Sequence, residues 1–165
     1  ISEFDICNLV EKAIDDLRIV ANQENTHVEL ARPADSIYMS GDIRRVERII
    51  RNLLTNAIDH AEGKSINTKI AQDEQAVSIS VRDHGVGISN ENLPRVFDRF
   101  WRGDPSRARI RGGTGLGLAI ALEDARLHNG LLEAWGRPGR GANFVLTLPK
   151  KVGEQIPQPV LDAKF

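Results

Sequence analysis

The run of apolar residues between Val46 and Ala61 restricts the fold more than any other feature of this chain. Its apolar positions recur at steps of three and four residues and fall on one arc of a helical wheel: Val46, Ile49, Ile50, Leu53, Leu54, Ala57 and Ala61. Asp42, a residue type that caps helices well, precedes the run. The pattern predicts a helix that begins near Asp42 and packs one face on a sheet.

Other segments show equally clear periodicity. An amphipathic helix is expected from Ile6 to Ala21, and another from Leu116 to Leu127, where Asn129-Gly130 follows as a stop signal. A shorter helix is expected from Ser89 to about Asp98. Strands are expected in two short segments that could pair with each other, and in two hairpins: 27–31 and 36–40, then 66–70 with 77–81 and 131–135 with 142–148.

Hairpin strands together with helices that carry single apolar stripes imply one layer of helices on one layer of sheet. We therefore predict an α/β fold, a two-layer sandwich with a mixed, mostly antiparallel sheet and three main helices on one face. A chain of 165 residues fits one domain, assigned to 1–150, with the first helix within 1–24. Residues 151–165 have no periodic face and are expected to form a flexible tail.

Composition excludes several classes of function. The net charge of −1 provides no field that would favour nucleic acid as a partner, and the single Cys7 allows no internal disulfide. We expect no membrane span within the chain. Because the sequence begins with Ile1 rather than Met, we interpret it as a segment of a longer protein, with the upstream part as the place where a membrane anchor would lie.

A polar stripe borders the apolar arc of the helix that begins near Asp42. Its members lie within about 80° of one another on the helical wheel: Arg45, Arg48, Asn52, Asn56 and Asp59. Two asparagines one turn apart place neutral amide oxygens side by side, which suits Mg²⁺ held mainly by phosphate and water. Solvated helix residues would give the same local pattern, so the stripe alone leaves both interpretations open.

Two glycine-containing segments favour a nucleotide site. Asp83 shares strand parity with Val81, so its carboxylate is expected to face the packed side and to need a donor, which an exocyclic amine would supply. Gly85 and Gly87 would let a flat ligand approach the backbone, although an ordinary turn looks the same. The glycines of 112–117 open a helix whose free N–H groups suit phosphates, with a flexible linker as the alternative.

Residues around these segments are weaker candidates. Arginines crowd the loop before Gly113, and Arg102 is the one chosen as a possible phosphate contact. Phe97, Phe100 and Trp101 are interpreted mainly as packing that holds this loop. His60 lies just beyond the asparagines and could reach a base or phosphates, with plain packing as an equal alternative.

Taken together, four motifs occur in an order and spacing that resemble the ATP-binding half of sensor histidine kinases. They correspond to the N box, first glycine box, F box and second glycine box of that family, which shares its ATPase fold with gyrase, Hsp90 and MutL: Asn52-Leu-Leu-Thr-Asn56-Ala57, Asp83-x-Gly85-x-Gly87, Phe97-Asp-Arg-Phe100 and Gly113-x-Gly115-x-Gly117. The resemblance implies a Bergerat-type ATP-binding fold with a mobile ATP lid at 99–114.

The resemblance also implies roles for single residues. Asn56 would bind Mg²⁺ with Asn52 nearby, and both are the catalytic candidates. Asp83 would accept a hydrogen bond from the adenine amino group. The other residues expected to contact ATP are Asp59, His60, Gly85, Gly87, Ile88, Arg102, Gly113, Thr114, Gly115, Leu116 and Gly117. Many family members have Lys and Tyr where this chain has Asp59 and His60, so the usual lysine contact to phosphate is missing. Its replacement by an arginine of the lid, and that of the Tyr by His60 against the base, are two hypotheses.

In the family, the terminal phosphoryl group of ATP passes to a histidine on a separate dimerisation domain of the same protein and then to a response regulator. The resemblance therefore implies ATP and ADP as ligands, a monomeric fragment, a homodimeric whole protein and a cytoplasmic domain of a membrane-anchored sensor. A hydrolytic ATPase of the gyrase type is disfavoured, because those enzymes have Glu where this chain has Asn52. A serine kinase acting on an anti-sigma partner and a non-catalytic nucleotide sensor stay possible.

Overall fold

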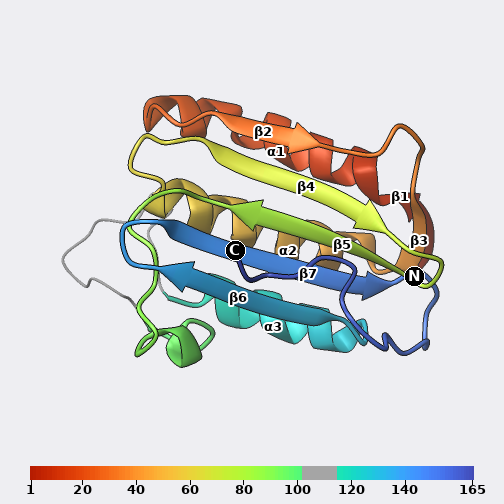
Figure 1. Ribbon diagram of the computed structural model, residues 1–165. Coiled ribbons are helices and arrows are strands. Elements are labelled where there is room, and N and C mark those ends of the chain that lie inside the picture. The colour runs from red at the N-terminus through yellow and green to blue at the C-terminus, as the bar shows by residue number, and fades with distance from the viewer. Residues whose placement is uncertain (102–114) are drawn as a thin grey trace.

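The computed structural model describes residues 1–101 and 115–165, which form a helical layer packed against a sheet (Figure 1). In chain order the elements are β1 (Ser2–Asp5), α1 (Ile6–Gln23), β2 (Val28–Ala31), β3 (Tyr38–Gly41), α2 (Ile43–His60), β4 (Ile66–Gln72), β5 (Ala76–Arg82), η1 (Leu93–Arg95), α3 (Gly117–Leu127), β6 (Leu131–Arg137) and β7 (Gly141–Pro149). None of the described helices is long and apolar enough to cross a membrane.

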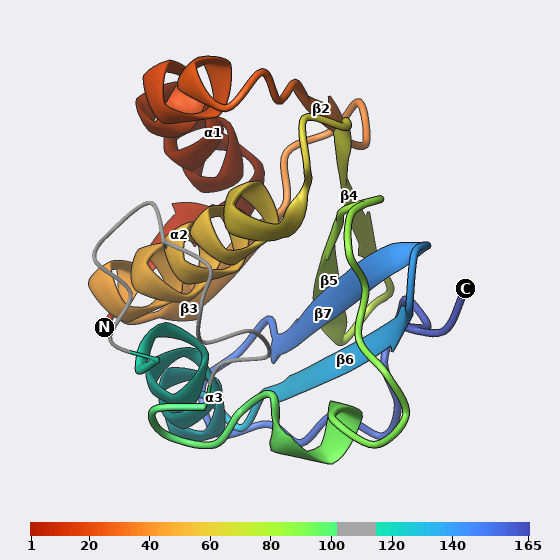
Figure 2. The same ribbon diagram turned by 90° about the vertical axis from the view of Figure 1, so that its left-hand side faces the viewer.

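The main sheet has the strand order β2-β4-β5-β7-β6. Strand β2 runs parallel to β4, whereas every other neighbouring pair in this sheet is antiparallel. Helices α1, α2 and α3 lie on the same side of the sheet, as the edge-on view shows (Figure 2). The predicted two-layer sandwich, with a mixed and mostly antiparallel sheet, is therefore confirmed.

Helix α2 forms where the sequence pattern placed it. The side chain of Asp42 accepts hydrogen bonds from the backbone N–H groups of Arg44 and Arg45 and so satisfies two donors that the first turn leaves free. Its apolar stripe is buried from Val46 to Ile58. Removing this much apolar surface from water is the main force that holds the two layers together.

The two predicted hairpins are also present. In the first, the carboxylate of Asp73 accepts hydrogen bonds from the N–H groups of Gln75 and Ala76, which stabilises the turn between β4 and β5. In the second, Gly139 and Gly141 have φ values of 74° and 88°, a conformation that glycine adopts without strain. The register of β5 and β7 places Val81 opposite Phe144, both facing the helices within the core.

Three segments differ from the sequence-based expectations. The segments 28–31 and 38–41 are strands but do not pair with each other, because β2 joins β4 and β3 joins the unpredicted strand β1. A four-residue strand carries too little pattern to specify its partner. Between Ser89 and Asp98 there is one 3₁₀ turn at Leu93–Arg95 in place of a longer helix, and Pro94 disfavours helical geometry for the residue before it.

The last part of the segment 151–165, for which a flexible tail was predicted, contacts the sheet through Val160, Leu161 and Ala163, whereas residues 151–155 are exposed. It crosses the face opposite the helices (Figure 2), and Ala163 is buried there. The sequence carries no signal for this contact, because the covered positions belong to the outer faces of strands more than ten residues earlier in the chain. Only the folded sheet creates the surface on which the tail rests.

Candidate nucleotide site

Asp83 follows β5 directly and is buried, with 1% of its surface exposed. Its backbone N–H donates to the carbonyl of Ala142 in β7, and one carboxylate oxygen accepts a 3.0 Å hydrogen bond from the N–H of Gly85. Burial raises the pKa of the Asp83 carboxyl, and the Gly85 hydrogen bond and the nearby His60 only partly offset this effect. The inward orientation predicted from strand parity is therefore confirmed.

The glycines after Asp83 serve close backbone packing. A Cβ atom at Gly85 would collide with the carbonyl oxygen of His60, and one at Gly87 would collide with the carbonyl oxygen of Arg137. Gly87 also has a φ of 78°. The space that side chains would fill is thus occupied by backbone from α2 and the β6–β7 hairpin, so packing within the protein already requires glycine at both positions. Contact of Gly85 and Gly87 with a flat ligand stays a prediction.

The amide of Asn52 links the two helices that carry the proposed phosphate and metal residues. Its Nδ2 donates a 3.0 Å hydrogen bond to the carbonyl of Gly117, the first residue of α3. Asn52 is half-buried, as are Asn56 and Asp59 one and two turns further along α2. The N box and the end of the second glycine box therefore meet across the α2–α3 interface.

His60 connects the end of α2 to the loop that follows Asp83. Its Nδ1 lies 2.7 Å from the carbonyl oxygen of Asn56, and its own carbonyl accepts a hydrogen bond from the N–H of Val86. Ile88 packs against Gly136 from the same loop. The loop that continues Asp83 is therefore held between α2 and the β6–β7 hairpin, next to the asparagines.

The predicted phosphate segment is described in part. Gly115 has a φ of 77°, and its carbonyl accepts a 2.9 Å hydrogen bond from the N–H of Phe100, so the chain on the two sides of 102–114 meets here. Leu116 and Gly117 follow at the start of α3. Arg102, Gly113 and Thr114 lie outside the described residues, as does most of the predicted lid.

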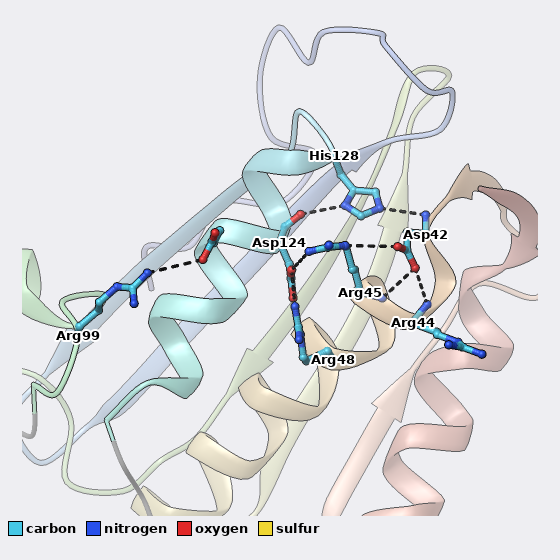
Figure 3. Close-up of polar contacts among 8 residues, drawn as sticks. Asp42, Arg44, Arg45, Arg48, Arg99, Asp124 and His128 are labelled. Carbon is cyan, nitrogen blue, oxygen red and sulfur yellow. Dashed lines mark hydrogen bonds and ion pairs between the residues drawn. The ribbon is translucent and has the colours of Figure 1, made fainter.

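An ion-pair network around one buried carboxylate, which the sequence analysis missed, joins α2 to α3 (Figure 3). Asp124 is fully buried and accepts hydrogen bonds from Arg48 at 2.7 and 2.8 Å and from Arg45 at 3.0 Å. The N–H of Asp42 donates to Nε2 of His128, whose Nδ1 contacts the carbonyl of Asp124. The available signal was a carboxylate between Ala121 and Ala125 on the packed face of a helix, which needs a partner.

The same network changes the interpretation of the polar stripe on α2. Arg45 and Arg48 face α3 and its buried carboxylate, whereas Asn52 reaches the first residue of α3. The stripe therefore divides into a structural half near the start of α2 and a half with amides near Gly117. Only the second half lies toward the loop of Asp83, through the contacts of His60 described above.

The residues near Asn56 fit a magnesium ion that takes most of its ligands from elsewhere. Among the described residues, no cluster of three or more His, Cys, Asp or Glu side chains could hold a metal. Mg²⁺ commonly keeps several waters and binds nucleotide phosphates through few protein oxygens. A neutral amide oxygen from Asn56, with Asn52 one turn away, matches this ligand chemistry.

Comparison with known proteins agrees with this geometry. The family model described as histidine kinase-, DNA gyrase B-, and HSP90-like ATPase matches residues 41–152. The sensor histidine kinase MtrB of Mycobacterium tuberculosis strain H37Rv is 49% identical over 160 residues, which are 97% of this chain and 28% of that protein. The chain thus spans about a quarter of the length of this relative.

Solved structures share the fold. The catalytic domain of histidine kinase ThkA superposes with a TM-score of 0.79 at 23% identity, covering 91% of this chain and 95% of that one. Full-length ShkA in complex with AMPPNP gives a TM-score of 0.78 at 24% identity, covering 95% of this chain and 32% of that one. At these identities the likeness concerns the arrangement of helices and strands.

Proposed function

We propose, from the premise that this chain belongs to the family of histidine kinase-, DNA gyrase B- and HSP90-like ATPases, that it binds Mg-ATP as the catalytic domain of a sensor histidine kinase. Its reaction would transfer the terminal phosphoryl group of ATP to a histidine on a separate dimerisation domain. The bond between that phosphorus and the bridging oxygen of ADP breaks, and a bond from phosphorus to an imidazole nitrogen forms.

The observation that carries this proposal is the carboxylate of Asp83. It is buried, it has no ion pair among the described residues, and the donors that act on it are backbone N–H groups, with that of Gly85 at 3.0 Å. A buried carboxylate with unused acceptor capacity is unfavourable unless a ligand supplies a donor. The exocyclic amine of adenine is such a donor, so Asp83 would select adenine over bases that have an oxygen at that position.

The phosphate side of the site would be formed by α2 and α3. Asn56 would bind the metal, and the first N–H groups of α3 beyond Gly115 would face the phosphates. When bound, Mg²⁺ neutralises charge on the phosphate oxygens. Asn52 holds the first residue of α3 through its amide, and an amide cannot take a proton from water. This favours transfer to an external histidine over hydrolysis.

Phosphoryl acceptors and partners belong to the same proposal. MtrB is named a sensor histidine kinase, and this chain matches about a quarter of it. The histidine-bearing domain would belong to the rest of such a protein, which would form a homodimer. The response regulator would be a separate chain. The cytoplasm, where ATP is abundant, is the location this proposal requires. The imidazole proton would pass to a base on the acceptor domain.

Calorimetry with Mg-ATP tests the binding half of the proposal. Replacement of Asp83 by Asn preserves the size of the side chain and an acceptor for the Gly85 N–H, but weakens the acceptor for adenine. We expect an increase in the Kd for ATP of roughly tenfold to a hundredfold. Asp35→Asn is the matched control, since it makes the same exchange at an exposed position. No measurable ATP binding by the unaltered chain would contradict the proposal.

A phosphotransfer assay tests the catalytic half. The chain is mixed with the histidine-bearing domain of a relative and with ATP labelled on the terminal phosphate. Acid-labile label on that domain, lost in the Asn56→Ala variant, is the expected result. Binding of ATP without any phosphohistidine would instead identify a nucleotide sensor, an alternative that Asp59 and His60 keep open because the lysine and tyrosine common in the family are replaced here.

A further inference from the structure

The last residues of the chain form a strap across the outer face of the main sheet. We use the term tail strap for residues 156–165, which lie on the side away from the helices (Figures 1 and 2). Ser78 in β5 and Thr147 in β7 point to this outer face, yet both are fully buried. The tail strap therefore covers the centre of the sheet as an integral part of the domain.

Ser78 holds the middle of the tail strap. Its Oγ accepts hydrogen bonds from the N–H of Val160 at 3.1 Å and from the N–H of Leu161 at 3.3 Å. The same oxygen lies 2.7 Å from Oγ1 of Thr147, to which Ser78 can donate its own hydrogen. One buried hydroxyl thus joins the tail strap to both central strands.

The end of the tail strap reaches the strand ends at the nucleotide site. Nδ2 of Asn143 donates a 3.0 Å hydrogen bond to the carbonyl of Ala163, and the guanidinium carbon of Arg82 lies 3.7 Å from the centre of the Phe165 ring. Arg82 and Asn143 are register partners in β5 and β7. Arg82 directly precedes Asp83, and Asn143 directly follows Ala142, the residue whose carbonyl accepts the hydrogen bond from the N–H of Asp83.

At the end of β5, contacts are made on both faces of the sheet by two successive residues. On the inner side the carboxylate of Asp83 is buried, and on the outer side the neighbouring residue Arg82 lies against Phe165. Successive residues of a strand point to opposite faces, so a rotation that lifts Arg82 outward also displaces Asp83. Contacts on Arg82 therefore limit the directions in which the Asp83 carboxylate can turn.

We propose that the tail strap, through Phe165 on Arg82 and Ala163 on Asn143, is a positioning element that fixes the carboxylate of Asp83 for recognition of the adenine amine. The proposal rests on the proposed function and adds to it a specificity role for a segment outside the nucleotide motifs. Phe165 is a positioning residue, since it acts through Arg82 and the end of β5 without touching the ligand.

The size of the effect should be moderate. Within the described part of the chain, Nε of Arg82 and Oδ1 of Asn143 are buried without a hydrogen-bond partner. The end of the tail strap is held by the hydrogen bond from Asn143, by Phe165 on Arg82 and by the more distant ammonium of Lys164, 5.3 Å from the centre of the Trp135 ring. We expect Phe165→Ala to increase the Kd for ATP by about threefold to tenfold, the range of one ordinary hydrogen bond.

The decisive readout is the ratio of the affinities for ATP and inosine triphosphate, which has an oxygen in place of the adenine amine. Calorimetry on the full chain, well below its melting temperature, should show that Phe165→Ala lowers this ratio while the Kd for inosine triphosphate stays constant. Phe165→Tyr keeps an aromatic ring on Arg82 and should restore the ratio. Gln158→Ala, at an exposed position of the tail strap, is the control and should leave it unchanged.

An unchanged ratio in Phe165→Ala overturns the proposal, whether both affinities fall together or neither changes. Failure of the unaltered chain to bind ATP would instead remove the proposed function. A measurement without nucleotide separates the two cases. Amide exchange of Asp83 and Gly85, followed by NMR, should become faster in Phe165→Ala and not in Gln158→Ala, and equal exchange rates in the two variants would contradict the positioning role.

Discussion

Two buried aspartates, Asp83 at the end of β5 and Asp124 within α3, differ in what surrounds them. Both are almost completely inaccessible to solvent. Asp124 accepts three hydrogen bonds from the guanidinium groups of Arg45 and Arg48, whereas Asp83 accepts one from the backbone N–H of Gly85. One carboxylate is therefore fully used inside the protein, and the other retains capacity for a ligand.

The pKa shifts of the two carboxyls have opposite signs because their hydrogen-bond partners differ. Burial raises the pKa of Asp83, and no arginine of residues 1–101 and 115–165 forms an ion pair that would offset this effect. Burial alone would also raise the pKa of Asp124, but the hydrogen bonds from Arg48 and Arg45 outweigh it and hold the pKa below its ordinary value. Burial of a charge thus identifies a candidate site only where its partner is missing from the fold.

The largest effect is expected where Asp124 loses its partners. The double variant Arg45→Ala with Arg48→Ala leaves a buried carboxylate without a cation and should lower the free energy of unfolding by about 3–5 kcal/mol. Urea unfolding followed by circular dichroism measures it. Arg44→Ala removes an exposed arginine from the same turn and should have little effect. A double variant as stable as Arg44→Ala would mean that the network does not hold α3 on α2.

A smaller effect of opposite sign is expected at Asp83. Exchange for Asn removes a desolvated charge while it keeps the acceptor for the Gly85 N–H, so the free energy of unfolding at pH 7 should stay equal or rise by up to about 2 kcal/mol. In Asp124→Asn the same exchange should lower it by about 1–3 kcal/mol, since the two arginines are half-exposed and can turn to water. Destabilisation of Asp83→Asn as large as that of Asp124→Asn would remove the distinction between the two aspartates.

The smallest expected effect is the pH dependence of the free energy of unfolding, which should also distinguish Asp83 from Asp124. Because the folded-state pKa of Asp83 is raised, its stabilising contribution is present at low pH and is lost as pH rises from the ordinary Asp range through the raised value. The lowered pKa of Asp124 means that its contribution is present above the ordinary range and is lost as pH falls below it. The stability difference between each Asn variant and the unaltered chain should therefore change in opposite directions between about pH 3 and 7, a range set by the ordinary Asp pKa. Parallel curves would contradict these assignments.

Long periodic segments were predictable because the spacing of their apolar residues defines both the type of element and the face that is buried. The stripe of α2 and the alternation in β4, β5 and β7 specify their elements and inward faces without knowledge of neighbours. Short strands were less predictable. Four residues of β2 or β3 do not encode a partner, so the sheet order and the pairing of β3 with β1 required the folded chain.

In the candidate site, the orientation of the Asp83 carboxylate was predictable, but the backbone contacts that hold the loop after it were not. Strand parity alone placed the Asp83 carboxylate inward, and this is confirmed. The sequence did not show a second reason for glycine at position 85, where the missing side chain admits the carbonyl of His60 from α2. That contact joins residues 25 positions apart in a way that no local pattern records. The roles of Asn56 and His60 toward ATP stay predictions.

The sequence by itself determined which long segments form helices and strands, which side of each is buried, and that the carboxylate of Asp83 would point inward and need a donor. These properties depend on periodicity and on the high free energy of an unpaired buried charge, which act locally. Tertiary structure alone decided that Arg45 and Arg48 serve Asp124, and that Phe165 lies on Arg82 behind Asp83. Contacts between distant segments exist only once the sheet has formed, because it brings their side chains within bonding distance.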